Sequence, residues 1–100
     1  MSETWLMHNP PHPGRILRQM YLEPLELPAA VLADRLGVSH ETVAQLLDEQ
    51  GRITPDFAWR LAQFWGMSVR YWSGLQEEFD LWHARQSTDL SQVQPLTPAT

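Results

Sequence analysis

A run of hydrogen-bonding side chains that begins at Ser39 gives this sequence its most specific chemical signal. Hydroxyl, imidazole, carboxylate, carboxamide and guanidinium groups follow one another there, directly after a glycine. The six candidate contact residues in this segment are Ser39, His40, Glu41, Thr42, Gln45 and Arg52. Groups of these kinds recognise phosphates and the edges of nucleotide bases. The chemistry that they indicate is therefore binding, with double-stranded DNA as the expected ligand.

No arrangement typical of an enzyme accompanies these residues. The sequence has no Cys, no glycine-rich phosphate loop and no nucleophile signature of a Ser-His-Asp triad. His8 and His12 lie in a proline-rich segment instead of on one helix face, His40 and His83 are scattered elsewhere, and no acid or Cys completes a tetrahedral set. We therefore expect no enzymatic activity, no metal and no cofactor.

Two helices joined by a short turn are needed to present the contact residues, and residues 29–48 have the matching pattern. Ala33 is small enough to lie where two helices cross, and Gly37 permits the left-handed backbone of a tight turn. Ser39 is a good N-cap, which leaves the first N–H groups of the next helix facing outward. The pattern predicts a helix-turn-helix whose second helix meets a major groove. The alternative is a helical hairpin with no role in DNA binding.

Proline, glycine and capping residues divide the chain into five expected helices, over residues 14–24, 28–37, 39–51, 54–66 and 68–85. The last is the longest, and no strand pattern of useful length is present, so the predicted fold class is all-α. We expect an extended N-terminal arm over 1–13, a helix-turn-helix domain over 14–85 and a flexible tail over 86–100, with a brief extended piece at Leu90–Val93. The apolar stripe expected on the first helix consists of Ile16, Leu17, Met20, Tyr21 and Leu25.

Charge and hydrophobicity exclude several classes of protein. The formal net charge is −5, which argues against a nonspecific nucleic-acid binder, because such proteins carry a basic field. No apolar run approaches the roughly 18 residues needed to span a bilayer, and the first residues lack the pattern of a signal peptide. We therefore expect a cytoplasmic protein with no membrane partner.

Several linked motifs resemble those of one known family. They are His12-Pro13-Gly14-Arg15-Ile16-Leu17, Tyr21-Leu22-Glu23-Pro24-Leu25, Leu36-Gly37-Val38-Ser39 and Ile53-Thr54-Pro55-Asp56, followed by shorter matches up to Trp82. In order and spacing they resemble the HigA family of antitoxins, within the wider XRE group of Cro and phage-repressor-like proteins. The resemblance implies a five-helix, lambda-repressor-like DNA-binding domain with a longer C-terminal helix. It also implies an antitoxin that neutralises a small basic ribonuclease toxin of the RelE-like type and represses its own operon at a palindromic operator.

The sequence departs from the family pattern in its charge. Pro28 and Ala29 stand where the family usually has Ser-Gln, and the second helix of the turn opens with His40 and Glu41 instead of a basic residue and Asn. Residues 27–54 carry four acids against two Arg, and acids that face a duplex repel its phosphates. Glu41 or Asp48 can still accept from a cytosine amino group, and Gln45 can pair with adenine. Two alternatives are thus a toxin-binding protein with weakened or lost DNA binding, and a regulator without a toxin.

Three further groups of side chains have two interpretations each. Five aromatic residues are expected in the core, but Tyr71, Leu75 and Leu81 are a surplus that predicts a homodimer through the C-terminal helix. The acids Glu77, Glu78 and Asp80 form either a solvated face or a docking surface for a basic toxin. Arginines contact phosphates or form surface ion pairs, and Arg52 is the best placed for a phosphate. The aromatic residues expected in the core are Trp59, Trp65, Trp72, Phe79 and Trp82.

Overall fold

The structure is a computed structural model that describes residues 9–96. Residues 1–8 of the expected arm, which include His8, and residues 97–100 of the expected tail lie outside the described residues. Within residues 9–96 every regular element is helical, as predicted. The elements are α1 (Pro13–Ile16), η2 (Leu17–Leu22), α2 (Glu23–Leu25), α3 (Ala29–Leu36), α4 (His40–Leu47), α5 (Pro55–Trp65) and α6 (Val69–Ser87). Because α1, η2 and α2 follow one another without a break, they form one helix, and the described fold has five helices.

Several helix ends lie at the capping residues that the sequence indicated. The prediction was wrong for the end of α4, which stops at Leu47 instead of near Gly51 because the chain turns at Glu49, with a positive φ of 63°. The side chains of Ser39, Thr54 and Ser68 each accept a hydrogen bond from a backbone N–H in the first turn of the helix that follows. Gly37 and Gly66 end α3 and α5 in the left-handed conformation, with φ of 74° and 68°. These caps satisfy N–H and C=O groups that a helix terminus leaves unpaired.

The first helix contains one wide turn, which the sequence did not reveal. η2 is a π-helix, and at its end the Glu23 N–H donates to the carbonyl of Arg18, five residues earlier. Pro24 follows immediately, has no N–H to donate, and its ring crowds the carbonyl four residues before it. With this wider pitch Leu22, five residues after Leu17, faces the core. Met20 and Leu25 are 60% and 61% exposed, so their prediction as part of the inner stripe was wrong.

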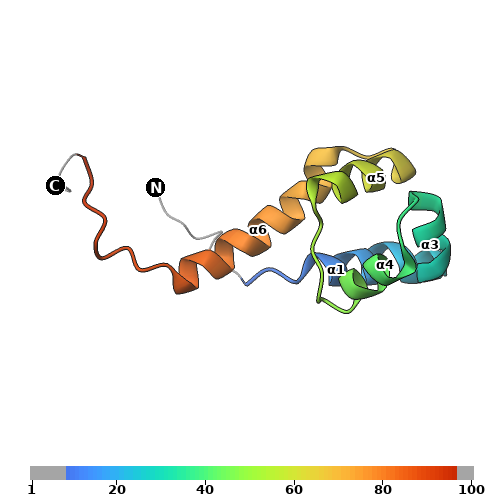
Figure 1. The fold of residues 1–100 in the computed structure, drawn as a ribbon, viewed down its shortest axis with the longest axis horizontal. Helices are drawn as coiled ribbons and strands as arrows, with labels where there is room; N and C mark the ends of the chain where they lie inside the picture. Colours follow the sequence, from blue (N-terminus) through green and yellow to red (C-terminus); the bar gives the residue numbers. More distant parts are fainter. Residues whose placement is uncertain (1–8, 97–100) are drawn as a thin grey trace.

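Apolar side chains from all five helices pack together in the core. Leu17, Leu32, Leu46, Leu61 and Trp72 are at most 1% exposed, and burial of such a side chain stabilises the fold by about 1.5–3 kcal/mol. Figure 1 shows α1, α3 and α4 grouped together, α5 beside the start of α6, and the rest of α6 extending away from the other helices. The described chain is accordingly elongated, with extents of 55 × 24 × 22 Å.

The predicted aromatic core is confirmed only in part. Trp72 is fully buried, and its ring lies 5.0 Å from that of Tyr21 and 5.6 Å from that of Trp65, which is itself half-buried. Phe79 and Trp82 are also half-buried. Trp59 is 66% exposed, so its placement in the core was wrong. The buried face of α5 is formed by the pairs Phe57–Ala58 and Leu61–Ala62, and the residue after each pair is rotated outward.

The segment after α6 is a turn and not an extended strand. α6 continues to Ser87, and the N–H of Val93 donates to the carbonyl of Leu90 at 3.0 Å. The brief extended piece predicted at Leu90–Val93 was therefore wrong. Short polar side chains in this segment favour local hydrogen bonds over an extended strand. One example is the bond from the Ser91 N–H to the Asp89 carboxylate at 2.9 Å.

Candidate nucleic-acid interface

The turn between α3 and α4 is held by hydrogen bonds on both sides. The N–H groups of Gly37 and Val38 donate to the carbonyl of Ala33 at 2.9 and 3.1 Å. From α5, the guanidinium of Arg60 donates to the carbonyl of Leu36 at 2.7 Å. Gly37 has the positive φ predicted for the turn, and that conformation costs a residue with a β-carbon about 1–2 kcal/mol. The angle between the two helices is therefore fixed from within the domain.

The amino end of α4 is capped and exposed. The Ser39 Oγ accepts from the Thr42 N–H at 3.1 Å and lies 2.7 Å from the Thr42 hydroxyl. Both residues are exposed, as are His40 and Glu41 between them. The first N–H groups of a helix, together with hydroxyls beside them, form a surface suited to an anionic oxygen such as that of a phosphate.

The two faces of α4 are sharply different. Val43, Leu46 and Leu47 are buried in the core, whereas the outward side chains are exposed and polar apart from Ala44. On the outward face Gln45 Nε2 donates to a carboxylate oxygen of Glu41 at 3.3 Å. The structure thus brings together on one surface five of the six predicted contact residues: Ser39, His40, Glu41, Thr42 and Gln45.

The sixth predicted contact residue, Arg52, is bound to α6. Its guanidinium donates twice to the carboxylate of Asp80, at 2.6 and 3.3 Å. This pairing raises the pKa of Arg52 and, through the same hydrogen bonds, lowers the pKa of Asp80. The predicted acidic cluster on α6 is therefore divided, because Asp80 is paired while Glu77 and Glu78 are exposed on the surface.

Other charged side chains near α4 are paired as well. Arg15 donates to both carboxylate oxygens of Glu49, at 3.1 and 3.2 Å, which lowers the pKa of Glu49. His40 Nε2 lies 2.8 Å from Asp34 of α3. Between residues 9 and 96, neither Glu41 nor Asp48 has a cationic partner within 4.0 Å. The exposed face of α4 consequently keeps the negative character that the sequence predicted.

Two buried polar residues that position α4 were not identified as such from the sequence. Gln76 is 4% exposed and accepts the N–H of Ile53, in the segment that follows α4. His12 is 9% exposed, and its Nδ1 accepts the Gly14 N–H at 2.9 Å. A β-carbon on Gly14 would overlap the carbonyl oxygen of Leu46 in α4. The burial of Gln76 could have been predicted from its spacing, because a residue four positions after Trp72 lies on the same, buried face of α6.

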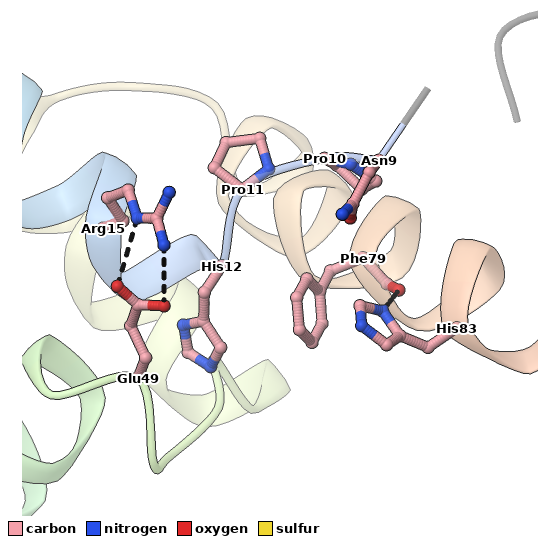
Figure 2. A pocket seen from close by; sticks show the side chains of 8 residues that line it. All are labelled: Asn9, Pro10, Pro11, His12, Arg15, Glu49, Phe79 and His83. Atoms are coloured by element: carbon pink, nitrogen blue, oxygen red, sulfur yellow. Dashed lines mark hydrogen bonds and ion pairs between the residues drawn. The ribbon is translucent and has the colours of Figure 1, made fainter. Parts of the chain in front are cut away.

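His12 also lies in a surface pocket beside this interface. The pocket has a volume of about 520 Å³ and is formed where the start of the described chain crosses α6. Figure 2 shows the Arg15–Glu49 pair on one side and, on the other, the ring of Phe79 between His12 and His83. The ring centroids are 4.9 Å apart for His12 and Phe79, and 4.2 Å for Phe79 and His83. These contacts join the chain before α1 to α6.

Two further observations concern sites of other kinds. Among residues 9–96 there is no group of three His, Cys, Asp or Glu side chains arranged to hold a metal ion. No helix in this part of the chain combines the length and the apolar character needed to cross a membrane.

The fold and the exposed face of α4 define a class of protein, a helix-turn-helix protein with a capped and outward-facing second helix. No family model matches the chain. Virulence-associated protein I of Dichelobacter nodosus is 41% identical over 75 residues, which are 75% of this chain and 69% of that protein. The structure of Pseudomonas aeruginosa antitoxin HigA with the higBA promoter matches with a TM-score of 0.80 and 35% identity, over 88% of this chain and 99% of the other.

A second solved structure, of antitoxin GraA in complex with its operator, matches with a TM-score of 0.84 and 36% identity, over 91% of this chain and 95% of that one. The chain belongs to the HigA family of helix-turn-helix antitoxins and transcriptional regulators.

Proposed function

We propose that this protein is a cytoplasmic antitoxin that binds a palindromic operator as a dimer, represses its own operon and neutralises a small basic toxin. The observation that carries the DNA-binding part is the exposed face of α4, where five hydrogen-bonding residues gather at a capped helix end. The operator complexes of HigA and GraA, which share this fold, support the same role.

Each contact residue has a proposed partner on the DNA. Ser39 and Thr42, at the amino end of α4, are placed for a phosphate, where the helix dipole also favours an anion. His40, Glu41 and Gln45 are placed for base edges in the major groove. Arg52 is proposed as a phosphate contact that must first leave Asp80, because its guanidinium is held on α6 in the free protein.

An electrophoretic shift with the protein's own promoter, at stated salt concentrations, tests operator binding. Gln45→Ala is expected to reduce discrimination between the operator and a scrambled duplex by about 1–3 kcal/mol. Gln63→Ala removes the same side chain from the exposed face of α5 and is the matched control. Equal selectivity of the two variants would contradict a role of Gln45 in reading bases.

The dimer is proposed to form through α6. Leu81 is 43% exposed in the second half of α6 and lines a surface pocket with Ile53 and Pro55. A two-fold dimer would repeat α4 at the spacing of palindromic half-sites, about 34–36 Å. Leu81→Glu should therefore produce a monomer in sedimentation velocity. Leu96→Glu, at a fully exposed position after the helix, should leave the dimer intact.

The toxin is proposed to be a basic ribonuclease of the RelE-like type that contacts the acids Glu77 and Glu78 on α6. Co-purification of a small basic protein encoded beside this one is the direct test. Replacing both acids with Gln should weaken that complex, with Glu26→Gln as the control. If no such protein co-purifies, the function is that of a regulator without a toxin partner.

A second candidate function is toxin binding without competent operator binding. The observation that favours it is the charge of the α4 surface, where Glu41 and Asp48 lack ion-pair partners in the described chain while Arg15 and Arg52 are held by acids. In this case binding to the promoter should disappear near physiological salt, about 0.15 M, and show no sequence preference.

The division into an arm over 1–13, a domain over 14–85 and a tail over 86–100 remains a proposal. Limited proteolysis is expected to trim both ends and leave a stable fragment that begins near α1 and ends near Ser87.

A further inference from the structure

Glu41 is an unusual residue at the tip of a helix proposed to enter DNA. It is the second residue of α4, it is exposed, and no cation within the described chain lies close enough to pair with it. The imidazole beside it, that of His40, is directed to Asp34 at 2.8 Å. If α4 lies in the major groove, this carboxylate approaches a surface lined by phosphates on both sides, and their repulsion must be offset by a specific contact.

Within the major groove, only the amino groups of the bases can donate a hydrogen bond to a carboxylate. Both carboxylate oxygens accept hydrogen bonds, so they need a donor, and the donors there are the amino groups of cytosine and adenine. The adenine amino group adjoins the N7 acceptor of the same base, which repels a carboxylate. Cytosine presents its N4 amino group without such an acceptor on its own edge.

The structure also shows how the carboxylate is held. Gln45, one turn further along α4, donates from Nε2 to one oxygen of Glu41 at 3.3 Å. This contact leaves the second oxygen of Glu41 available. It also engages one of the two N–H groups of the Gln45 amide, so the two side chains are coupled on the exposed face of α4.

We propose that Glu41 determines operator specificity by accepting a hydrogen bond from the N4 amino group of a cytosine in each half-site, with Gln45 as the residue that positions its carboxylate. The inference rests on the proposed operator binding. Asp48, the other unpaired acid, lies at the opposite end of α4, where its own N–H donates to the carbonyl of Ala44. Since the amino-terminal residues of such a helix reach the bases, Asp48 is not assigned this role.

Selection of bound duplexes from a library with randomised half-sites tests the inference. The proteins compared are the full-length wild type, Glu41→Ala, Glu41→Gln, Gln45→Ala and Asp48→Asn. The wild-type protein should prefer cytosine at one position of each half-site by about 5- to 100-fold. Glu41→Ala should abolish that preference. Glu41→Gln should change the preferred base to adenine, because a carboxamide pairs with N6 and N7 together. Gln45→Ala should weaken the preference for cytosine at the same position.

Asp48→Asn is the matched control, since it removes one negative charge from the same helix without touching the proposed contact. All three charge-removing variants should bind a duplex without the operator at least as tightly as wild type, which a misfolded variant would not do. If the wild-type protein selects a motif and Glu41→Ala or Glu41→Gln selects the same one, the inference is overturned while operator binding stands. If the wild-type protein selects no motif, operator binding itself is overturned, and the role of Glu41 with it.

Discussion

Gln76 Oε1 accepts a hydrogen bond from the backbone N–H of Ile53 at 2.7 Å, and both residues are almost completely buried. The Nε2 of the same Gln76 donates to Asp80 at 3.0 Å, and Asp80 in turn binds Arg52. One side chain of α6 therefore holds the segment that leaves α4. A helix proposed to join two protomers is in this way connected directly to the surface proposed to meet DNA.

Replacing Gln76 with Leu should destabilise the fold. The substitution leaves the buried N–H of Ile53 without an acceptor, which costs about 1–3 kcal/mol. Urea denaturation followed by circular dichroism measures the loss. Gln63→Leu changes an exposed residue of α5 and should stay within about 0.5 kcal/mol of wild type. A stability of Gln76→Leu equal to that of this control would show that water or another group satisfies Ile53.

Two glycines should respond to alanine in opposite directions. Gly37 has a φ of 74°, so Gly37→Ala should lower the free energy of unfolding by about 1–2 kcal/mol. Gly74 lies within α6, and a β-carbon there would have no atom within 4 Å. Gly74→Ala should therefore stabilise the helix by about 0.5–1 kcal/mol. Thermal or urea unfolding of the two variants compares the signs, and equal effects would be inconsistent with the turn described.

Asp80→Asn should strengthen DNA binding. The variant keeps an oxygen that can accept from Gln76 but loses the charge that holds Arg52 on α6. With Arg52 released to a phosphate, the slope of log affinity against log salt should become steeper by about one unit. Titrations of operator DNA at several salt concentrations measure this slope. Adding Arg52→Ala to the variant should remove the gain, and a gain that persists would assign it to some other group.

Acid should weaken the fold partly through Glu49 and Asp80. Hydrogen bonds from Arg15 and Arg52 lower the pKa of each carboxylate in the folded state. A lowered folded pKa gives stability that is complete above the ordinary pKa and is lost as the pH falls through the folded pKa, here as the pH falls below about 5. The double variant Glu49→Gln, Asp80→Asn should show a flatter decline of the urea midpoint over this range.

Salt provides the control for that experiment. Both ion pairs are exposed to solvent, so about 1 M NaCl should bring the two profiles closer together. Profiles that remain parallel to each other at low salt would mean that these carboxylates do not carry the pH dependence.

The helix-turn-helix could be predicted from the sequence because its determinants are local. Gly37 and Ser39 specify a turn and a cap within a few residues, and the alternation of buried and exposed positions on α4 follows the helical period. Five of the six predicted contact residues are accordingly exposed at the start and on the outer face of α4, while their contact with DNA stays a prediction.

The position of the Arg52 guanidinium could not be predicted in the same way. Its partner, Asp80, is 28 residues further along the chain, and only the packing of α6 brings the two together. The prediction for Trp59 was wrong because it rested on the size and apolar character of the side chain. The position of a residue around the helix decides its burial, and Phe57, Ala58, Leu61 and Ala62 form the buried face of α5, so Trp59 is directed to solvent.

The wide turn within the first helix holds one residue more between Leu17 and Leu22 than a regular α-helical turn would. Leu17 and Leu22 occupy the same face five residues apart, where an ordinary helix would place residues three or four apart. Deletion of the exposed Met20 would bring the two leucines to a separation of four, and regular pitch would then return both to the interior. We therefore expect a one-residue deletion at this point to change the local winding of the first helix and to leave the arrangement of the helices that follow unchanged.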